Sequence, residues 1–349
     1  KYNKLQSGPP KQAAKFDPRS GTPEPPEGAA AIGSQPFLER GRMSCIIRTK
    51  RSRICLYWNA PMKICALTMV YQDYWAISQW YRHYGREVGT ANLYIICHGQ
   101  DPKIAQLCPD ASIITIPRDD LANFDRVRLR VMNDIQSALN HIYDWVIQTD
   151  ADELICYDPQ LHSSFADVFQ STAAPAIFAL GLNLAEVDGD AELQATESVF
   201  AQRRIAAVTG NYSKAWATKR GMPLRLHGVF CGHRRALKFP FEMPDGVFLV
   251  HLKHANSAAL KETNAVRQSV ADSVGEDWNV KGWAKPDFHA KRFFRKLARA
   301  EDLPWPDAVA LGYEKIRGNP VRDPERGIVK PPFINYVCRT TLPVWFHRG

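Results

Sequence analysis

Short apolar runs separated by polar segments dominate the first half of the chain. Each has the length and the bounding turn residues typical of a buried strand, and they lie at 64–70, 93–97, 112–117 and 143–149. After the first run, apolar residues recur at helical spacing, at Tyr74, Ile77, Tyr81 and Tyr84. Asp73 is the expected N-cap of that helix, and residues 124–140 carry a second such face. The order strand, helix, strand, strand, helix, strand predicts an α/β fold with a mostly parallel sheet sandwiched by helices.

Three carboxylates follow the fourth run, at Asp150, Asp152 and Glu153. Side chains alternate along a strand, so we expect Asp150 and Asp152 to project to one side and Glu153 to the other. Two carboxylates held together are costly unless a cation lies between them, and Mg²⁺ characteristically joins one or two carboxylates to substrate phosphates. The alternative is a strand end with a solvated acidic turn. Asp73 and Asp101 also follow predicted strands, at the sheet edge where ligands of parallel sheets bind.

The chain is basic, with a net charge of +9 and a pI near 9.1. Phosphate-bearing substrates or an anionic membrane surface fit this charge, whereas the basic residues form no nucleic-acid-binding motif, so no nucleic acid is expected as a partner. The 8 cysteines form no CxxC pair, which argues against a structural zinc site and favours a reducing compartment. GxGxxG, GxxxxGK[ST] and GxSxG motifs are absent.

Composition changes at both ends of this central pattern. Residues 1–40 are rich in Pro, Gly, Ala and Lys and predict a tail or linker, 41–260 the main domain, and 261–349 a helical, basic C-terminal extension. Residues 287–300 combine aromatic and basic residues. Such a helix can lie on an anionic membrane, although packing of its aromatic side on the domain is the favoured interpretation. No run approaches the length needed to span a bilayer. We expect a cytoplasmic protein, with peripheral contact to the inner face of a membrane as a further hypothesis.

Two stretches resemble family-2-like glycosyltransferases. The strand, polar pair and aromatic-rich helix at 69–85 is similar to the opening of that family, and 144–155 (DWVIQTDADELI) is similar to one branch's "DaDE" version of the DxD motif. The resemblance covers residues 62–160 well and 205–260 loosely. It implies a GT-A fold, a nucleotide-diphosphate sugar as donor, and Mn²⁺ or Mg²⁺. Gln72–Asp73 stands where the family has Asn-Glu, a departure that leaves the role of this pair open.

The resemblance also implies roles for single residues. Asp152 would ligate the metal, and Asp150 would contact the donor ribose or join the metal site, directly or through water. Glu153 would hold the turn or an acceptor hydroxyl. Asp101 stands where the family places an acidic residue near the nucleobase. The remaining donor contacts would come from Asp73 and from Lys214, which could reach a donor phosphate.

The second half supplies candidates for the metal site and the catalytic base. Residues 248–254 resemble a late strand end in this branch, where His251 would complete the metal site as a neutral imidazole. His251 faces opposite to its apolar neighbours, although a histidine satisfied in the core is the alternative, and His254 is a weaker candidate. An inverting transferase needs a carboxylate base. Glu186 and Asp188 are the candidates, with an acidic surface loop as the alternative.

Together these features predict a metal-dependent glycosyltransferase that moves a sugar from a nucleotide-diphosphate donor to a hydroxyl of a glycan or other acceptor. Two alternatives stay open. One is a non-catalytic nucleotide- or glycan-binding module of the same fold. The other is a Mg²⁺-dependent phosphoesterase, which the positive charge and the carboxylates also fit.

Overall fold

The computed structural model describes residues 44–49, 52–57, 61–119, 124–193, 197–219, 221–225, 227–274 and 285–348. The chain divides into two units, Lys1–Ala60 and Pro61–Gly349. In the first unit, β1 (Ser44–Thr49) and β2 (Ser52–Tyr57) form an antiparallel pair. The predicted tail at 1–40 lies outside the described residues.

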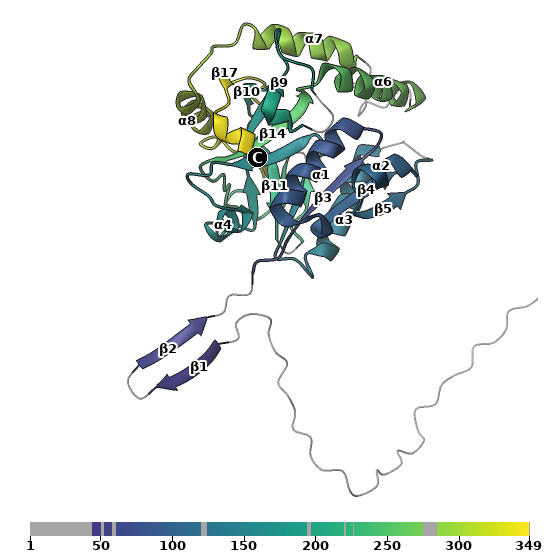
Figure 1. Ribbon diagram of the computed structural model, residues 1–349. Coiled ribbons are helices and arrows are strands. Elements are labelled where there is room, and N and C mark those ends of the chain that lie inside the picture. The colour runs from purple at the N-terminus through teal and green to yellow at the C-terminus, as the bar shows by residue number, and fades with distance from the viewer. Residues whose placement is uncertain are drawn as a thin grey trace, which may run out of the picture. The chain divides into compact units, whose positions relative to one another are not determined.

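A six-stranded sheet occupies one half of the second unit (Figure 1). In spatial order it contains β5 (Ser112–Ile116), β4 (Leu93–His98), β3 (Ile64–Val70), β6 (Trp145–Gln148), β11 (Ala215–Thr218) and β8 (Ala176–Phe178). The first four strands are parallel, whereas β11 is antiparallel to both of its neighbours. The four strands predicted from the apolar runs therefore form the parallel part of this sheet.

Helices cover both faces of the parallel strands, as β3 illustrates. Ala66 and Val70 belong to the same core cluster as Trp80 of α1 (Tyr74–Val88). The alternate residue Leu67 belongs to a second cluster with Met132 of α3 (Phe124–Leu139). Every residue of β3 after the first is buried, as expected for a strand covered on both faces. The predicted α/β class with a helix-sandwiched parallel sheet is confirmed.

A second sheet packs its strands in the order β17 (Arg339–Thr341), β10 (Ile205–Thr209), β9 (Leu180–Ala185), β14 (Val247–His254) and β7 (Glu153–Tyr157). Only the β9–β14 pair in it is parallel. The segment 176–185 does not form one strand, because the structure divides it between β8 and β9, which belong to different sheets. A four-stranded antiparallel sheet adds β12 (Leu224–Arg225), β13 (Gly228–Phe230), β16 (Ile328–Lys330) and β15 (Val321–Asp323).

Residues 149–152 form the turn that carries the chain from β6 in the first sheet to β7 in the second. The expectation that one strand runs through Asp152 is therefore wrong. The amide of Glu153 donates to the carbonyl of Asp150 at 3.1 Å, which closes the turn. The indole Nε1 of the fully buried Trp80 donates to the Thr149 hydroxyl at 2.9 Å and ties the turn to α1. The acidic motif thus lies at the junction of two sheets.

The C-terminal third is mainly helical, with α6 (Ser257–Val274), α7 (Pro286–Leu297), α8 (Trp305–Ile316) and the 3-10 helix η3 (Val344–Arg348). The predicted domain boundary at residue 260 falls inside α6, and β15, β16 and β17 return to sheets begun earlier in the chain. Shorter helical elements are η1 (Thr90–Asn92), α2 (Pro102–Leu107), α4 (Phe165–Gln170) and α5 (Val199–Gln202). Among the described residues, no helix is both long and apolar enough to cross a membrane.

Candidate functional site

A cavity of about 340 Å³ opens where the acidic turn meets the second sheet. Its volume is at the lower end of the range typical of ligand pockets. Charged side chains of both signs line it. The acids are Asp73, Asp125, Asp150 and Asp152, and the bases are Arg118, Arg128, Lys214, Lys253 and Arg267. The cavity collects elements from the first half of the chain and from β14 and α6 of the second half.

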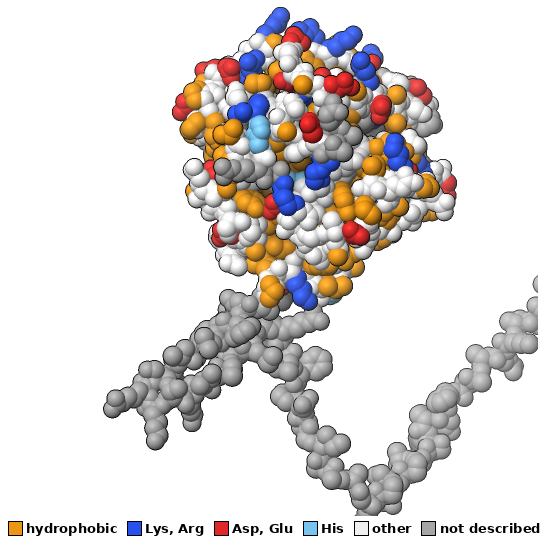
Figure 2. All heavy atoms as spheres, in the orientation of Figure 1, with side chains coloured by type: hydrophobic (Ala, Val, Ile, Leu, Met, Phe, Trp, Pro, Cys, Tyr) orange, Lys and Arg blue, Asp and Glu red, His pale blue; other side chains and the backbone are white. Residues whose placement is uncertain are grey.

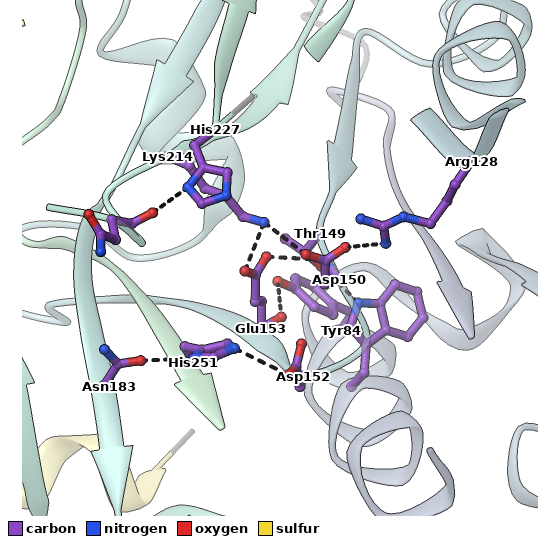
Figure 3. Close-up of polar contacts among 12 residues, drawn as sticks. Tyr84, Arg128, Thr149, Asp150, Asp152, Glu153, Asn183, Lys214, His227 and His251 are labelled. Carbon is purple, nitrogen blue, oxygen red and sulfur yellow. Dashed lines mark hydrogen bonds and ion pairs between the residues drawn. The ribbon is translucent and has the colours of Figure 1, made fainter. Parts of the chain in front are cut away.

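Asp150 is held between two cations (Figure 3). Arg128 of α3 approaches its Oδ1 at 2.7 Å, and Lys214, just before β11, approaches its Oδ2 at 2.9 Å. Burial opposes ionisation, but these two charges outweigh it and hold the pKa of Asp150 well below its ordinary value. Both carboxylate oxygens of Asp150 are therefore occupied by protein cations, which distinguishes it from Asp152.

Glu153 has a structural position beneath the turn. It is completely buried, its Oε2 accepts from the backbone amide of Asp150 at 3.1 Å, and its Oε1 lies 2.8 Å from the Lys214 ammonium. Burial, which outweighs the attraction of Lys214, raises the pKa of Glu153 to about 7. Of the two roles expected for Glu153, holding the turn is the one its contacts match. Lys214 forms ion pairs with both Asp150 and Glu153. A donor phosphate at Lys214, as predicted, would have to compete with these two carboxylates for the ammonium group.

Asp152, at the end of the turn, faces His251 of β14, and the Leu252 amide donates to the Asp152 carbonyl at 2.8 Å beside them. The His251 Nε2 lies 3.2 Å from Oδ2 of Asp152, and its Nδ1 lies 2.8 Å from Oδ1 of Asn183 (Figure 3). Strand register produces this arrangement, since His251 is the direct partner of Asn183 in the parallel β9–β14 pair. The ring of Tyr212 stacks on the imidazole at 3.8 Å and fixes its plane. The predicted orientation of His251 toward the cleft agrees with its place in the cavity lining.

The donor atoms of this pair fit a cation. Burial lowers the pKa of His251 and favours the neutral ring, whose single proton lies on Nδ1 when Asn183 Oδ1 accepts it. Despite its burial, Asp152 is held ionised by the protonated form of His251, whose charge and hydrogen bond lower the pKa of Asp152 to about 2. When the ring is neutral, the lone pair on Nε2 faces a carboxylate oxygen, an arrangement that a proton or a metal ion between them would satisfy. A histidine ligand typically has its other ring nitrogen held in this way.

The protein supplies few ligands to such an ion. Within the described part of the chain, no group of three or more His, Cys, Asp or Glu side chains could hold a metal. Mg²⁺ and similar hard cations are commonly bound by one or two carboxylates, substrate phosphates and water, and do not require a protein cage. The pair therefore fits a metal that arrives with a phosphate-bearing ligand.

Backbone geometry around the cavity is unusual in two ways. Among the described residues, Gln72 (φ 50°) and His227 (φ 69°) are the non-glycine positions with left-handed backbone. His227 lines the cavity, and Gln72 lies between the lining residues Tyr71 and Asp73. Strain of this kind gathers at functional sites. In β9, a Cβ at Gly181 would lie 2.4 Å from the carbonyl carbon of Tyr212, so glycine is what allows the segment before Lys214 to approach.

Asp73 and Asp101, both expected to bind the donor, differ in position. Asp73 caps α1 as predicted, with Oδ1 accepting from the Ala76 amide at 3.4 Å, and also lines the cavity. Burial and the charge of Asp152 raise the pKa of Asp73 to about 6. Asp101 caps α2 and accepts a hydrogen bond from the Tyr74 hydroxyl at 3.0 Å, but does not line the cavity.

The two expected bases are not part of the cavity lining. Glu186 accepts hydrogen bonds from the amide (2.8 Å) and hydroxyl (2.9 Å) of Ser257, at the start of α6, and pairs with the buried Arg203 at 3.1 Å. Although partial burial opposes it, these hydrogen bonds hold the pKa of Glu186 below its ordinary value. Asp188 is exposed on the loop after β9. The structure therefore does not support Glu186 as the base, because its carboxylate is used to join β9 to α6.

Several lining residues escaped the sequence analysis. Tyr71 follows β3, His98 is the last residue of β4, and Arg118 follows β5. They contact one another: the Arg118 guanidinium lies 3.4 Å from the centre of the Tyr71 ring and 2.8 Å from Nδ1 of His98. Their positions at the ends of parallel strands are a signal that sequence could have provided. Lys253 and Arg267 gave no such signal. Burial and the charge of Arg267 lower the pKa of Lys253 to about 8.

No protein-family model matches the chain, and no curated protein matches it. Among solved structures, the chain is similar to a CMP:2-keto-3-deoxy-manno-octonic acid synthetase complexed with CTP, with 14% identity over 61% of this chain and 86% of that chain and a TM-score of 0.24. It is also similar to a mannose-1-phosphate geranyltransferase from Thermus thermophilus, with 9% identity over 64% of this chain and 68% of that chain and a TM-score of 0.24. Similarity at this level assigns no function to the cavity.

Proposed function

We propose that the protein is a metal-dependent glycosyltransferase of GT-A type, which moves a sugar from a nucleotide-diphosphate donor to a hydroxyl of a glycan or other acceptor. The observation that carries this proposal is the Asp152–His251 pair, oriented by Asn183, at the wall of a cavity rich in Lys and Arg. The resemblance of 144–155 to a DxD motif supports it independently.

Asp152 and His251 are the residues that would hold Mn²⁺ or Mg²⁺, with Asp150 beside them. When bound, the cation would withdraw negative charge from the donor diphosphate as its bond to the sugar breaks. Arg128 and Lys214 keep Asp150 ionised and fixed in place. We expect the nucleoside near Tyr71, His98 and Arg118, at the carboxyl ends of the parallel strands.

The acceptor hydroxyl needs a base, and Asp73 replaces Glu186 and Asp188 in this role. It lines the same cavity as Asp152, and its pKa of about 6 leaves it ionised at neutral pH while keeping it basic enough to accept a proton. The cap that it forms on α1 holds its carboxylate at the N-terminus of the helix.

The test is transfer from a panel of nucleoside-diphosphate sugars, with Mn²⁺ or Mg²⁺ and with chelator, by wild type and Asp152→Asn. Candidate donors come from a thermal-shift screen of nucleoside diphosphates and their sugars with and without Mn²⁺. We expect metal-dependent transfer by wild type and its loss in the variant, with an unchanged melting temperature in the absence of ligand. Full activity in Asp152→Asn contradicts the metal assignment.

The same assay separates the alternatives. Donor binding that depends on metal, with no transfer or hydrolysis for any acceptor, would identify a binding module. Release of nucleoside monophosphate in place of diphosphate would identify a phosphoesterase. A two-metal phosphoesterase usually gathers several carboxylates around its ions, and the described residues contain no such group.

Peripheral membrane contact is the remaining part of the proposal, and α7 is the element suited to it. Phe293 and Leu297 of α7 are buried, with 7% and 3% exposure, whereas Phe288 is 54% exposed. Lys291, Arg292 and Arg295 are exposed, and successive steps of three or four residues from Phe288 (288–291–295 and 288–292–295) place them on one side of the helix. Figure 2 shows basic side chains gathered along the edge where Figure 1 places α7. An anionic membrane would be complementary to this side.

A further inference from the structure

Two of the five Lys and Arg side chains that line the cavity, Lys253 and Arg267, have neither an ion-pair partner nor an aromatic ring beneath them among the described residues, whereas Arg118 lies over the ring of Tyr71. Lys253 in β14 and Arg267 in α6 line the cavity, and neither forms an ion pair in the part of the chain that the structure describes. The Nη1 of Arg267 is buried and has no hydrogen-bond partner. Arg128 and Lys214, in the same cavity, are each paired with Asp150. Arg128 and Lys214 therefore form ion pairs with the acidic turn, whereas Lys253 and Arg267 form none among the described residues.

The unpaired arrangement is unfavourable without a ligand. A buried charged donor that has lost its water and gained no acceptor costs free energy. Lys253 and Arg267 also repel one another. Asp73 and Asp152 lie in the same cavity and the charge of Arg267 acts on both, but neither forms an ion pair with Lys253 or Arg267 in the described part of the chain. Two neighbouring cations facing a cavity with free donor atoms are complementary to an anion, and the ligand that enters the cavity is the available source of one.

The chemistry of the two side chains favours phosphate. A guanidinium presents a planar fork of N–H donors that matches two oxygens of one group, and an ammonium acts as a compact point charge beside it. Two cations match the charge of a doubly ionised phosphate better than that of a single carboxylate. We propose that Lys253 and Arg267 form an oxyanion subsite that binds a phosphate group of the substrate independently of the metal.

The subsite comes from the second half of the chain, because β14 and α6 both contribute residues to the cavity lining. The proposal rests on the proposed function in one respect only, the identity of the substrate that carries the phosphate. That group belongs either to the diphosphate of the donor or to a phosphorylated acceptor, and the chemistry recognised is the same for both.

The experiment is calorimetric titration of the full chain with inorganic pyrophosphate in the presence of EDTA. The variants are Lys253→Met and Arg267→Gln, which remove one charge each and nearly keep the side-chain length. The matched control is Lys261→Met, which removes a charge from an exposed position of α6 away from the cavity. We expect binding by wild type and by the control, and a loss of roughly tenfold or more in each cavity variant, the effect of one charge-assisted hydrogen bond.

Equal affinity of wild type and both cavity variants would overturn the proposal, as would the absence of pyrophosphate binding by wild type. Melting temperatures of all variants are measured first, and Arg267→Lys, which keeps the charge, should retain part of the affinity if Arg267→Gln loses stability. Because no metal and no transfer are involved, failure of the glycosyltransferase assay would not change this result. If the subsite binds the donor, Arg267→Gln should lose affinity for nucleoside diphosphates by the same factor as for pyrophosphate. If it binds the acceptor, Arg267→Gln should bind nucleoside diphosphates with the affinity of wild type.

Discussion

Replacement of Lys214 by Met should lower the stability of the fold, and this effect should be measurable in the absence of any ligand. The ammonium lies 2.8 Å from Glu153 and 2.9 Å from Asp150, and the side chains of Lys214 and Glu153 are 13% and 0% exposed. Removing one member of a buried ion pair leaves its partner uncompensated and costs about 3–5 kcal/mol. Asp150 is one-third exposed and would still be paired with Arg128, so its loss of the Lys214 contact should add little to this destabilisation. For a chain of this size the melting temperature should fall by roughly 4–7 °C.

Calorimetric melting at pH 8 measures this loss, and the double variant Lys214→Met/Glu153→Gln is the control. It removes both charges, so most of the stability should return. The pKa of Glu153 is raised to about 7, above its ordinary value. A carboxyl shifted in this direction stabilises the fold most at low pH, and that contribution is lost as the pH rises through 7. The Lys214→Met penalty should therefore be smaller at pH 5.5, where Glu153 is protonated, than at pH 8. A melting temperature within about 2 °C of wild type at pH 8 would refute this reasoning, and weakened donor binding in such a variant would restore the predicted phosphate contact of Lys214.

Three further predictions concern other parts of the molecule. Asp73→Asn keeps a good helix cap but removes the base, so kcat for transfer should fall by roughly 10²–10⁴-fold with donor affinity retained; an unchanged kcat contradicts the assignment. Burial lowers the pKa of His83 to about 4, so between pH 6.5 and pH 4 the unfolded chain binds one proton more than the folded chain. The free energy of unfolding therefore decreases as the pH is lowered from 6.5 to 4. In urea unfolding, His83→Gln should lose up to about 3 kcal/mol of this dependence, and a pH profile parallel to wild type would argue against it. Arg292→Gln/Arg295→Gln should bind anionic vesicles about 2 kcal/mol more weakly than wild type, whereas equal co-sedimentation would exclude α7 as the contact.

Local hydrophobic pattern was sufficient for the parallel strands and their helices. The runs at 64–70 and 93–97 coincide with β3 and β4 to within a residue, and Asp73 caps α1 as its position before a periodic helix predicts. These features depend on neighbours in sequence, since strand burial and helix spacing repeat over a few residues. The acidic motif was recognisable for the same reason, because it interrupts an apolar run.

The same local reasoning was wrong where one sequence pattern is compatible with two structures. An apolar run has the same appearance whether it forms one continuous strand or two strands joined by a bend. The segments 145–157 and 176–185 are each divided between two sheets. Glu186 illustrates the limit for polar residues, because a carboxylate in a loop reads as a candidate base until Ser257 and Arg203 are found around it.

The sequence by itself determined that a cluster of acidic residues follows a buried strand of an α/β sheet. Only the tertiary structure decided what each acid does. Asp150 and Asp152 are two residues apart, yet Arg128 and Lys214 hold the first while His251 faces the second. These partners lie between 22 and 99 residues away along the chain, and packing of two sheets at one turn brings them together. Contacts at that separation depend on how the elements pack, and no local pattern of residues encodes them.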